Sequence, residues 1–168
     1  MQTAQRRIAL FSIHSDPLAP LGSQESGGQN SYVYFLSKFL SHHGYDVDVY
    51  TRWDSPKKKQ IVYIDDHARV IRLKGGPIAQ LKKYDLMNVL PELFQGFLDF
   101  TKQEGTPAYE LFHGHYWDGG WVAMQAAAHF KKPFIQNFHS IGLQRMQTFQ
   151  RYETNQKAKD DFERRLKI

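Results

Sequence analysis

Along most of the chain, short apolar segments rich in strand-forming residues alternate with segments whose apolar residues recur at helical spacing. The expected strands cover residues 7–14, 46–52, 61–65, 68–73, 109–115 and 133–139. The expected helices cover residues 29–43, 86–102 and 121–130, and residues 144–168 are also compatible with a helix. Alternation of this kind is typical of a parallel sheet with helices on both faces. We therefore predict an α/β fold that is Rossmann-like and doubly wound around a mostly parallel sheet.

Length and composition place these segments in one domain. The 168 residues, 41% of them hydrophobic, suffice for one sizeable core, so a single domain over residues 1–168 is predicted. The helical pattern at the end of the chain runs to Ile168 without a capping or turn signal. We therefore expect the N-terminal domain of a longer protein, with its second domain absent from this chain.

Membrane and export signals are weak in this sequence. No apolar segment approaches the ~20 residues that span a bilayer. The apolar stretch near the N-terminus is interrupted at His14 and Asp16, which is too early for a secretory signal. The chain has no cysteine, so it can form neither a disulfide nor a thiolate zinc site. We expect a cytoplasmic protein without a membrane span.

The charge of the chain favours small anionic ligands over nucleic acid. The net charge is +5 and the isoelectric point is about 9.3. The densest basic run, residues 57–59, lies in an expected loop, and basic and aromatic residues do not interleave on one element as a nucleic-acid surface would require. We expect no nucleic-acid partner.

Polar residues, mostly histidines, stand where the expected strands end. His14, Arg52, His115 and His139 each close one of these strands, and His113 lies two residues before a strand end. In open parallel sheets, ligands bind beyond the carboxyl ends of the strands. The sequence therefore predicts a ligand site on this edge of the sheet.

The segment SQESGGQN carries two adjacent glycines, Gly27 and Gly28, directly before an expected helix. Glycines at a helix start allow a ligand close to the backbone, and the free N–H groups there favour a phosphate. A tight strand-to-helix turn would explain the same glycines. The dinucleotide-binding spacing G-x-G-x-x-G is absent, and the second strand ends in Arg52 instead of an acidic residue, so a nicotinamide oxidoreductase is poorly supported.

The histidines themselves leave more than one interpretation open. On a strand, His113 and His115 point to one side, but two histidines without a third ligand indicate packing more often than a metal site, so no metal is predicted. His139 and Ser140 are neighbours whose side chains point apart, and no G-x-S-x-G turn is present, so a hydrolase is unsupported. His139 could hydrogen-bond a sugar hydroxyl or cap a strand. Lysines in the segment LKGGPIAQLKKYDL are either solvated or positioned to hold a phosphate.

Four segments taken together resemble one protein family. HSDPLAPLGSQESGGQNSYV, GGPIAQLKKYDL, HGHYWDGGWVA and FHSIG occur in this order. They resemble the N-terminal domain of retaining glycosyltransferases of family 4, in particular the branch of sucrose-phosphate synthase and the mycothiol glycosyltransferases. The resemblance extends over nearly the whole chain. It implies the N-terminal half of a GT-B fold, in which this domain mainly binds the acceptor and the C-terminal domain binds the nucleotide sugar.

The resemblance also implies roles for individual residues. The amides of Gly27 and Gly28 approach the pyrophosphate of the donor, and Gln29 lies beside them. His139 faces the transferred sugar at the reaction centre and is the expected catalytic residue. The expected acceptor-binding residues, most of which match positions that hold a phosphate, are Asn30, Lys83, Tyr116, Ser140 and Arg165.

The implied activity is transfer of a hexose, with retention, from a nucleotide sugar to a phosphosugar acceptor. A UDP-sugar is the expected donor, and no metal or other cofactor is expected. The acceptor stays open between fructose 6-phosphate, an inositol phosphate and another phosphosugar, because HGHY and HSIG resemble one branch and the YW after HGH resembles the other. The donor-binding cation and paired glutamates belong to the absent domain, so the chain alone is expected to be nearly inactive. The alternative is a stand-alone phosphosugar-binding module without catalysis.

Overall fold

The computed structural model describes residues 6–20, 27–82 and 85–140, and beyond these residues 147, 151, 155–156, 159–160 and 163. The strands are β1 (Arg6–Phe11), β2 (Tyr45–Arg52), β3 (Ile61–Asp65), β4 (Ala68–Leu73), β5 (Tyr109–His115) and β6 (Phe134–Asn137). The helices are α1 (Gly28–His42), α2 (Leu90–Gln103) and α3 (Tyr116–Phe130), and a 3-10 helix, Asp85–Val89, precedes α2.

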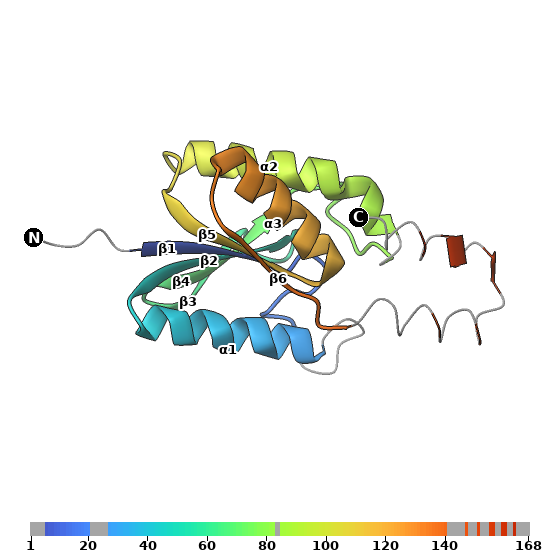
Figure 1. Cartoon of the computed structure of the whole chain (residues 1–168), viewed down its shortest axis with the longest axis horizontal. Coiled ribbons are helices and arrows are strands. Elements are labelled where there is room, and N and C mark those ends of the chain that lie inside the picture. The colour runs from blue at the N-terminus through green and yellow to red at the C-terminus, as the bar shows by residue number, and fades with distance from the viewer. Residues whose placement is uncertain are drawn as a thin grey trace, which may run out of the picture.

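The six strands form one sheet in the order β3-β4-β2-β1-β5-β6. All neighbouring strands are parallel except β3 and β4, which pair antiparallel across the turn at Asp66 and His67. Helix α1 covers one face of the sheet, and α2 and α3 cover the other (Figure 1). The predicted Rossmann-like, mostly parallel α/β fold is therefore confirmed.

Strand β1 contributes side chains to two hydrophobic cores, because successive side chains point to opposite faces of the sheet. Ile8 and Leu10 join the cluster beneath α1, where Val33 is fully buried. Ala9 and Phe11 join the larger cluster beneath α2 and α3. A strand buried on both faces reads as a continuous apolar run, which is why IALF predicts a central strand.

Several of the predicted boundaries differ from the observed ones. Strand β1 ends at Phe11 and not at residue 14; Ser12 and Ile13 still form backbone hydrogen bonds with β2, and the bond from the Ser12 hydroxyl to the Ser15 carbonyl belongs to the loop that follows. Strand β6 ends at Asn137, two residues before His139. Helix α3 begins at Tyr116, whereas the glycines of the segment WDGG favoured a later start.

A buried ion-pair network holds β1, β2, β4 and β5 together. The Asp48 side chain is 2% exposed, and its Oδ1 accepts a hydrogen bond of 2.6 Å from Arg69 Nε. Its Oδ2 accepts from the Tyr109 hydroxyl at 2.5 Å and from Arg7 Nη1 at 3.5 Å. Each partner comes from a different strand, so Asp48 ties strands that are far apart in the sequence.

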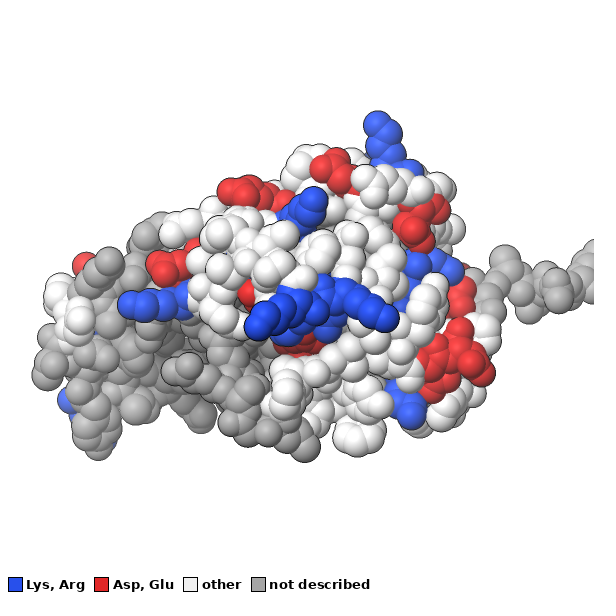
Figure 2. Space-filling view, turned by 180° about the vertical axis from the view of Figure 1, so that it is seen from behind, with Lys and Arg blue, Asp and Glu red and all other residues white. Residues whose placement is uncertain are grey.

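The outer surface carries mixed charge. Figure 2 shows Lys and Arg side chains forming a short band across the middle of the face turned away in Figure 1, with acidic side chains at several places around it. Within the described residues, no helix combines the length and the apolar character that crossing a membrane requires.

Candidate ligand site at the carboxyl edge of the sheet

The candidate site lies where the chain order reverses within the sheet. Strand β1 has β2 on one side and β5 on the other, so the segments leaving β1 and β5 diverge to opposite faces. In open α/β sheets such a switch point forms a crevice beyond the carboxyl ends of the strands. The segments that meet here are the loop after β1, the start of α1, the start of α3 and the residues after β6.

Asn30 fastens the loop after β1 to the start of α1. It is 2% exposed, and its Oδ1 accepts hydrogen bonds from the Ser15 hydroxyl at 2.5 Å and from Gly27 N at 3.0 Å. Its Nδ2 donates to the Asp16 carbonyl at 2.6 Å. All the polar groups of this side chain are used within the loop, so Asn30 shapes the site. Its contact with an acceptor stays a prediction.

The two glycines at the start of α1 are exposed and open to a ligand. A Cβ on Gly27 or Gly28 would meet no atom within 4 Å, and Gly27 has an extended backbone (φ −138°, ψ −164°) that any residue can adopt. Neither packing nor conformation among the described residues therefore demands glycine here. The Gly27 N–H is engaged by Asn30, whereas the Gly28 N–H has no acceptor in the described part of the chain. Of the two amides expected to be free, that of Gly27 is therefore engaged, and only that of Gly28 lacks an acceptor among the described residues.

Gln29 extends the same surface toward β1. Its Nε2 donates to the Ser12 hydroxyl at 3.1 Å, and that hydroxyl in turn donates to the Ser15 carbonyl at 2.7 Å. The side chain is half-buried. It therefore borders Gly27 and Gly28, which we call the glycine bend, without covering them.

The start of α3 packs unusually closely against β1 and β6. A Cβ on Gly119 would lie 2.2 Å from the Phe11 carbonyl oxygen, and one on Gly120 would lie 2.1 Å from Gln136 Oε1. The buried Asp118 accepts a 2.7 Å hydrogen bond from His14 Nδ1, which joins the loop after β1 to α3. These glycines are therefore packing residues that bring the first turn of α3 to the edge of the sheet.

Three histidines gather beside this helix start. The rings of His113 and His115 lie on the same side of β5 with centroids 4.2 Å apart, and His115 Nδ1 lies 2.9 Å from His139 Nε2. Burial lowers the pKa of His113 to about 4 and that of His115 to about 2, with smaller effects from the neighbouring histidines. Burial, followed by the charge of His14, also lowers the pKa of His139. The cluster is therefore uncharged near neutral pH.

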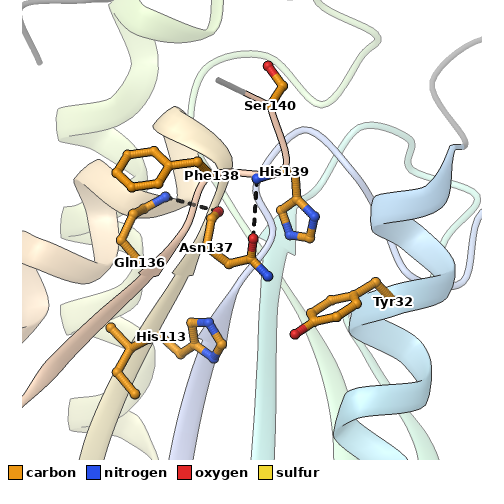
Figure 3. A pocket seen from close by; sticks show the side chains of 8 residues that line it. Tyr32, His113, Gln136, Asn137, Phe138, His139 and Ser140 are labelled. Carbon is orange, nitrogen blue, oxygen red and sulfur yellow. Dashed lines mark hydrogen bonds between the residues drawn. The ribbon is translucent and has the colours of Figure 1, made fainter. Parts of the chain in front are cut away.

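An open pocket of about 530 Å³ lies against this cluster (Figure 3). Tyr32 contributes to it from α1, His113 from β5, and residues 135–140 from β6 and the segment after it. The edge of the Tyr32 ring faces His139, with centroids 5.2 Å apart. The pocket thus has an aromatic wall, neutral imidazoles and the Ser140 side chain at one opening. Among the described residues, no three or more histidine, aspartate or glutamate side chains are placed so that they could hold a metal ion together.

Two site residues adopt a backbone conformation that disfavours side chains. Tyr116 and His139 have φ values of 64° and 52°, in the left-handed region. Such residues cost of order 1–3 kcal/mol each and cluster at functional sites. Tyr116 is 7% exposed, its carbonyl accepts from Gln136 Nε2 at 2.8 Å, and its ring lies 5.0 Å from that of His14. The structure therefore brings Tyr116, His139 and Ser140 to one edge of the sheet.

The other residues expected at this edge are either outside the described part of the chain or buried in other contacts. Lys83 and Arg165 lie outside the described residues. Arg52 was expected to offer its charge at this edge, but it is 4% exposed and donates to the carbonyls of Gly75, Pro77 and Ala79. It holds the loop of residues 75–79 in place, because a buried guanidinium needs several acceptors.

Tyr32 is a pocket residue that the sequence pattern does not identify. Tyr32, Phe35, Leu36, Phe39 and Leu40 recur at helical spacing, yet Tyr32, Phe35 and Phe39 are 45%, 67% and 58% exposed. The buried face is instead formed by Val33 together with the half-buried Leu36 and Leu40. A broad apolar stripe leaves the choice between these two rows open, so only the position of the sheet decides it.

The buried imidazoles predict a pH dependence of stability. Because the pKa of His115 is lower in the folded chain than its ordinary value of 6.5, the unfolded chain binds more protons below that pH, and stability falls as the pH falls. Between pH 6.5 and 5.5 the loss from His115 alone should be about 1 kcal/mol. We expect the unfolding free energy of His115→Asn to fall by about 1 kcal/mol less than that of the wild type over this pH range, measured by urea unfolding at both pH values. Equal losses in the variant and the wild type would contradict the depressed pKa.

Comparison with known proteins finds a family model and relatives that are all glycosyltransferases. The family model described as Glycosyltransferase Family 4 matches residues 26–167. The D-inositol 3-phosphate glycosyltransferase of Corynebacterium glutamicum (strain R) is 35% identical over 135 residues, which cover 80% of this chain and 32% of the relative. The protein of the same name from Corynebacterium urealyticum is 38% identical over 117 residues, 70% of this chain and 27% of the relative.

A solved structure agrees with this grouping. Sucrose-phosphate synthase from Thermosynechococcus elongatus superposes with a TM-score of 0.78 at 33% identity, over 91% of this chain and 36% of that chain. The chain spans about a third of the length of the curated relatives it matches.

Proposed function

We propose, from the premise that this chain belongs to glycosyltransferase family 4, that it is the acceptor-binding domain of a retaining hexosyltransferase. The full-length enzyme would move a hexose from a nucleotide sugar, with a UDP-sugar as the expected donor, to a phosphosugar. The domain that supplies most of the donor contacts would follow this chain. One relative is named for glycosylating an inositol phosphate and the solved structure for synthesising sucrose phosphate, so inositol 3-phosphate and fructose 6-phosphate both belong in the test.

The observation that carries this proposal is the meeting of the glycine bend and the histidine pocket at one edge of the sheet. Glycosyl transfer expels a nucleoside diphosphate, whose charge needs fixed donors at the moment of bond cleavage. The exposed start of α1, where the Gly28 N–H has no acceptor among the described residues, supplies such a donor together with the helix dipole. Tyr32 reaches His139 from the same helix, which links the two parts of the site.

His139 is the proposed catalytic residue of this domain. It lines the pocket, and its lowered pKa keeps the ring neutral near pH 7. A neutral imidazole presents one N–H donor and one acceptor, which suits the hydroxyl groups of a sugar. Tyr116 at the start of α3, the pocket residue Ser140, and Lys83 and Arg165 are the proposed phosphate-binding residues of the acceptor side.

The test is a transfer assay on the full-length polypeptide that contains this chain. UDP-sugars are combined in turn with fructose 6-phosphate, inositol 3-phosphate and other phosphosugars, and the anomeric configuration of each product is read by NMR. Transfer with retention to a phosphorylated acceptor supports the proposal. Binding of phosphosugars without transfer by any donor would instead support the non-catalytic module.

Lys83 provides a prediction for the acceptor side. We expect Lys83→Ala to weaken binding of a phosphorylated acceptor about tenfold or more, because a charge-assisted hydrogen bond contributes about 1.5–3 kcal/mol. Calorimetry with a phosphosugar measures the loss, and the unphosphorylated sugar should bind the variant and the wild type alike. The exposed neighbour Lys82 offers a matched control, since Lys82→Ala removes the same charge from the same segment. Equal affinities for all three proteins would remove Lys83 from the site.

A further inference from the structure

In the contact between His115 and His139, the bridging proton can lie on either ring. The two nitrogens that face each other are His115 Nδ1 and His139 Nε2, 2.9 Å apart. In a hydrogen bond between two neutral imidazoles, one nitrogen carries the proton and the other accepts it. The tautomers of the two rings are therefore coupled, and fixing one fixes the other.

The surroundings of His115 decide this choice. Its side chain is 0% exposed, and its second nitrogen, Nε2, is buried without a hydrogen-bond partner in the described part of the chain. A buried N–H without an acceptor is rarer and less tolerated than a bare acceptor without a donor. The proton of His115 therefore belongs on Nδ1, where it donates to His139.

The backbone keeps both rings in register for this contact. His115 is the last residue of β5 and pairs with Asn137 at the end of β6. The Asn137 side chain accepts a 3.2 Å hydrogen bond from His139 N, and His139 is held at a φ of 52°. Asn137 thus links the strand pairing to the strained position of His139.

We propose that His115 is a positioning residue that fixes His139 as its Nδ1–H tautomer. His139 Nε2 is then occupied as an acceptor, and Nδ1 is the one nitrogen of the ring that donates. Among the described residues, no group hydrogen-bonds to His139 Nδ1, so this N–H remains available for an oxygen of a ligand. The inference rests on the proposed function only in taking that ligand to be a sugar. The tautomer itself does not depend on any substrate.

The tautomers are read directly by ¹⁵N NMR of the histidine rings of the chain, without added ligand. At neutral pH, protonated and bare ring nitrogens resonate in separate regions, and His139→Gln identifies the signals of His139. The expected result is a protonated Nδ1 and a bare Nε2 on both His115 and His139. A protonated Nε2 on His139 overturns the proposal, and this measurement needs no variant of His115.

Two variants of His115 test whether it sets the tautomer. The amide of His115→Asn places an N–H near the position of Nδ1, so His139 should keep its proton on Nδ1. His115→Leu offers no donor, so His139 should shift toward the Nε2–H form that unconstrained histidine side chains favour. A backbone amide spectrum like that of the wild type establishes that each variant is folded. An unchanged His139 tautomer in folded His115→Leu would show that His115 does not set it, whether or not the full-length protein transfers sugars.

Discussion

Replacing Asp48 with alanine is expected to lower the free energy of unfolding by about 3–5 kcal/mol, since it removes one partner of a buried ion pair. Asp48 is 2% exposed and is the shared acceptor for Arg69, Arg7 and Tyr109. Without it, the Arg69 guanidinium, whose side chain is 11% exposed, keeps the ion pair with Glu104, whose side chain is 35% exposed, and its contact with the Phe100 ring. Urea unfolding followed by circular dichroism measures the loss.

Asp46 provides the matched control for this experiment. It lies two residues away on β2, and its side chain is 22% exposed and pairs with Arg7 and His67. Ion pairs of this kind contribute at most about 1 kcal/mol, so Asp46→Ala should be nearly neutral. Equal effects of the two substitutions would show that the Asp48 network does not hold the strands together as its geometry indicates.

His139→Ala is expected to reduce kcat of the full-length transferase by about 10²-fold or more, the usual effect of removing one fixed hydrogen-bond donor from a reaction centre. The ring lines the pocket and contacts both His115 and Tyr32, so its position is fixed before a substrate binds. Fixed groups act on the transition state without reorganisation, and therefore kcat should fall more than the acceptor KM rises. Steady-state kinetics at saturating donor separate the two effects.

His43 serves as the control for the loss of a histidine. It caps the far end of α1 and is exposed, and its ring lies tilted against that of Phe39 at a centroid distance of 4.0 Å. His43→Ala should leave kcat unchanged. A His139→Ala enzyme as fast as the His43→Ala enzyme would exclude His139 from the chemical step.

The sequence predicts the fold of this chain well because each element has a local cause. The apolar run IALF can be buried on both faces only in the middle of a parallel sheet, and the turn at Asp66 and His67 separates two short strands. Pro91 lies at the start of α2, where its missing N–H is tolerated. These signals depend on neighbouring residues, so a single sequence contains them.

The site is predicted less completely because its geometry depends on contacts between distant segments. In the sequence, Gly119 and Gly120 suggest a turn. In the structure they pack against β1 and β6, where no side chain would fit, and this permits α3 to start at Tyr116. Arg52 lies at a strand end, but its guanidinium donates hydrogen bonds to carbonyls of the loop of residues 75–79 and is not available to a ligand. Strand-end position therefore predicts which residues reach the edge, and tertiary contacts decide which of them remain available.

The central claim of this account is that the glycine bend at the start of α1 and the histidine pocket form one ligand site. The most direct measurement is a titration of the ¹⁵N-labelled chain with UDP-glucose, and then with fructose 6-phosphate and inositol 3-phosphate. We predict that the amide signals of Gly28, His139 and Ser140 shift together and follow one binding curve for at least one of these ligands. Shifts confined to one of the two segments, or to residues on other parts of the surface, would contradict a shared site.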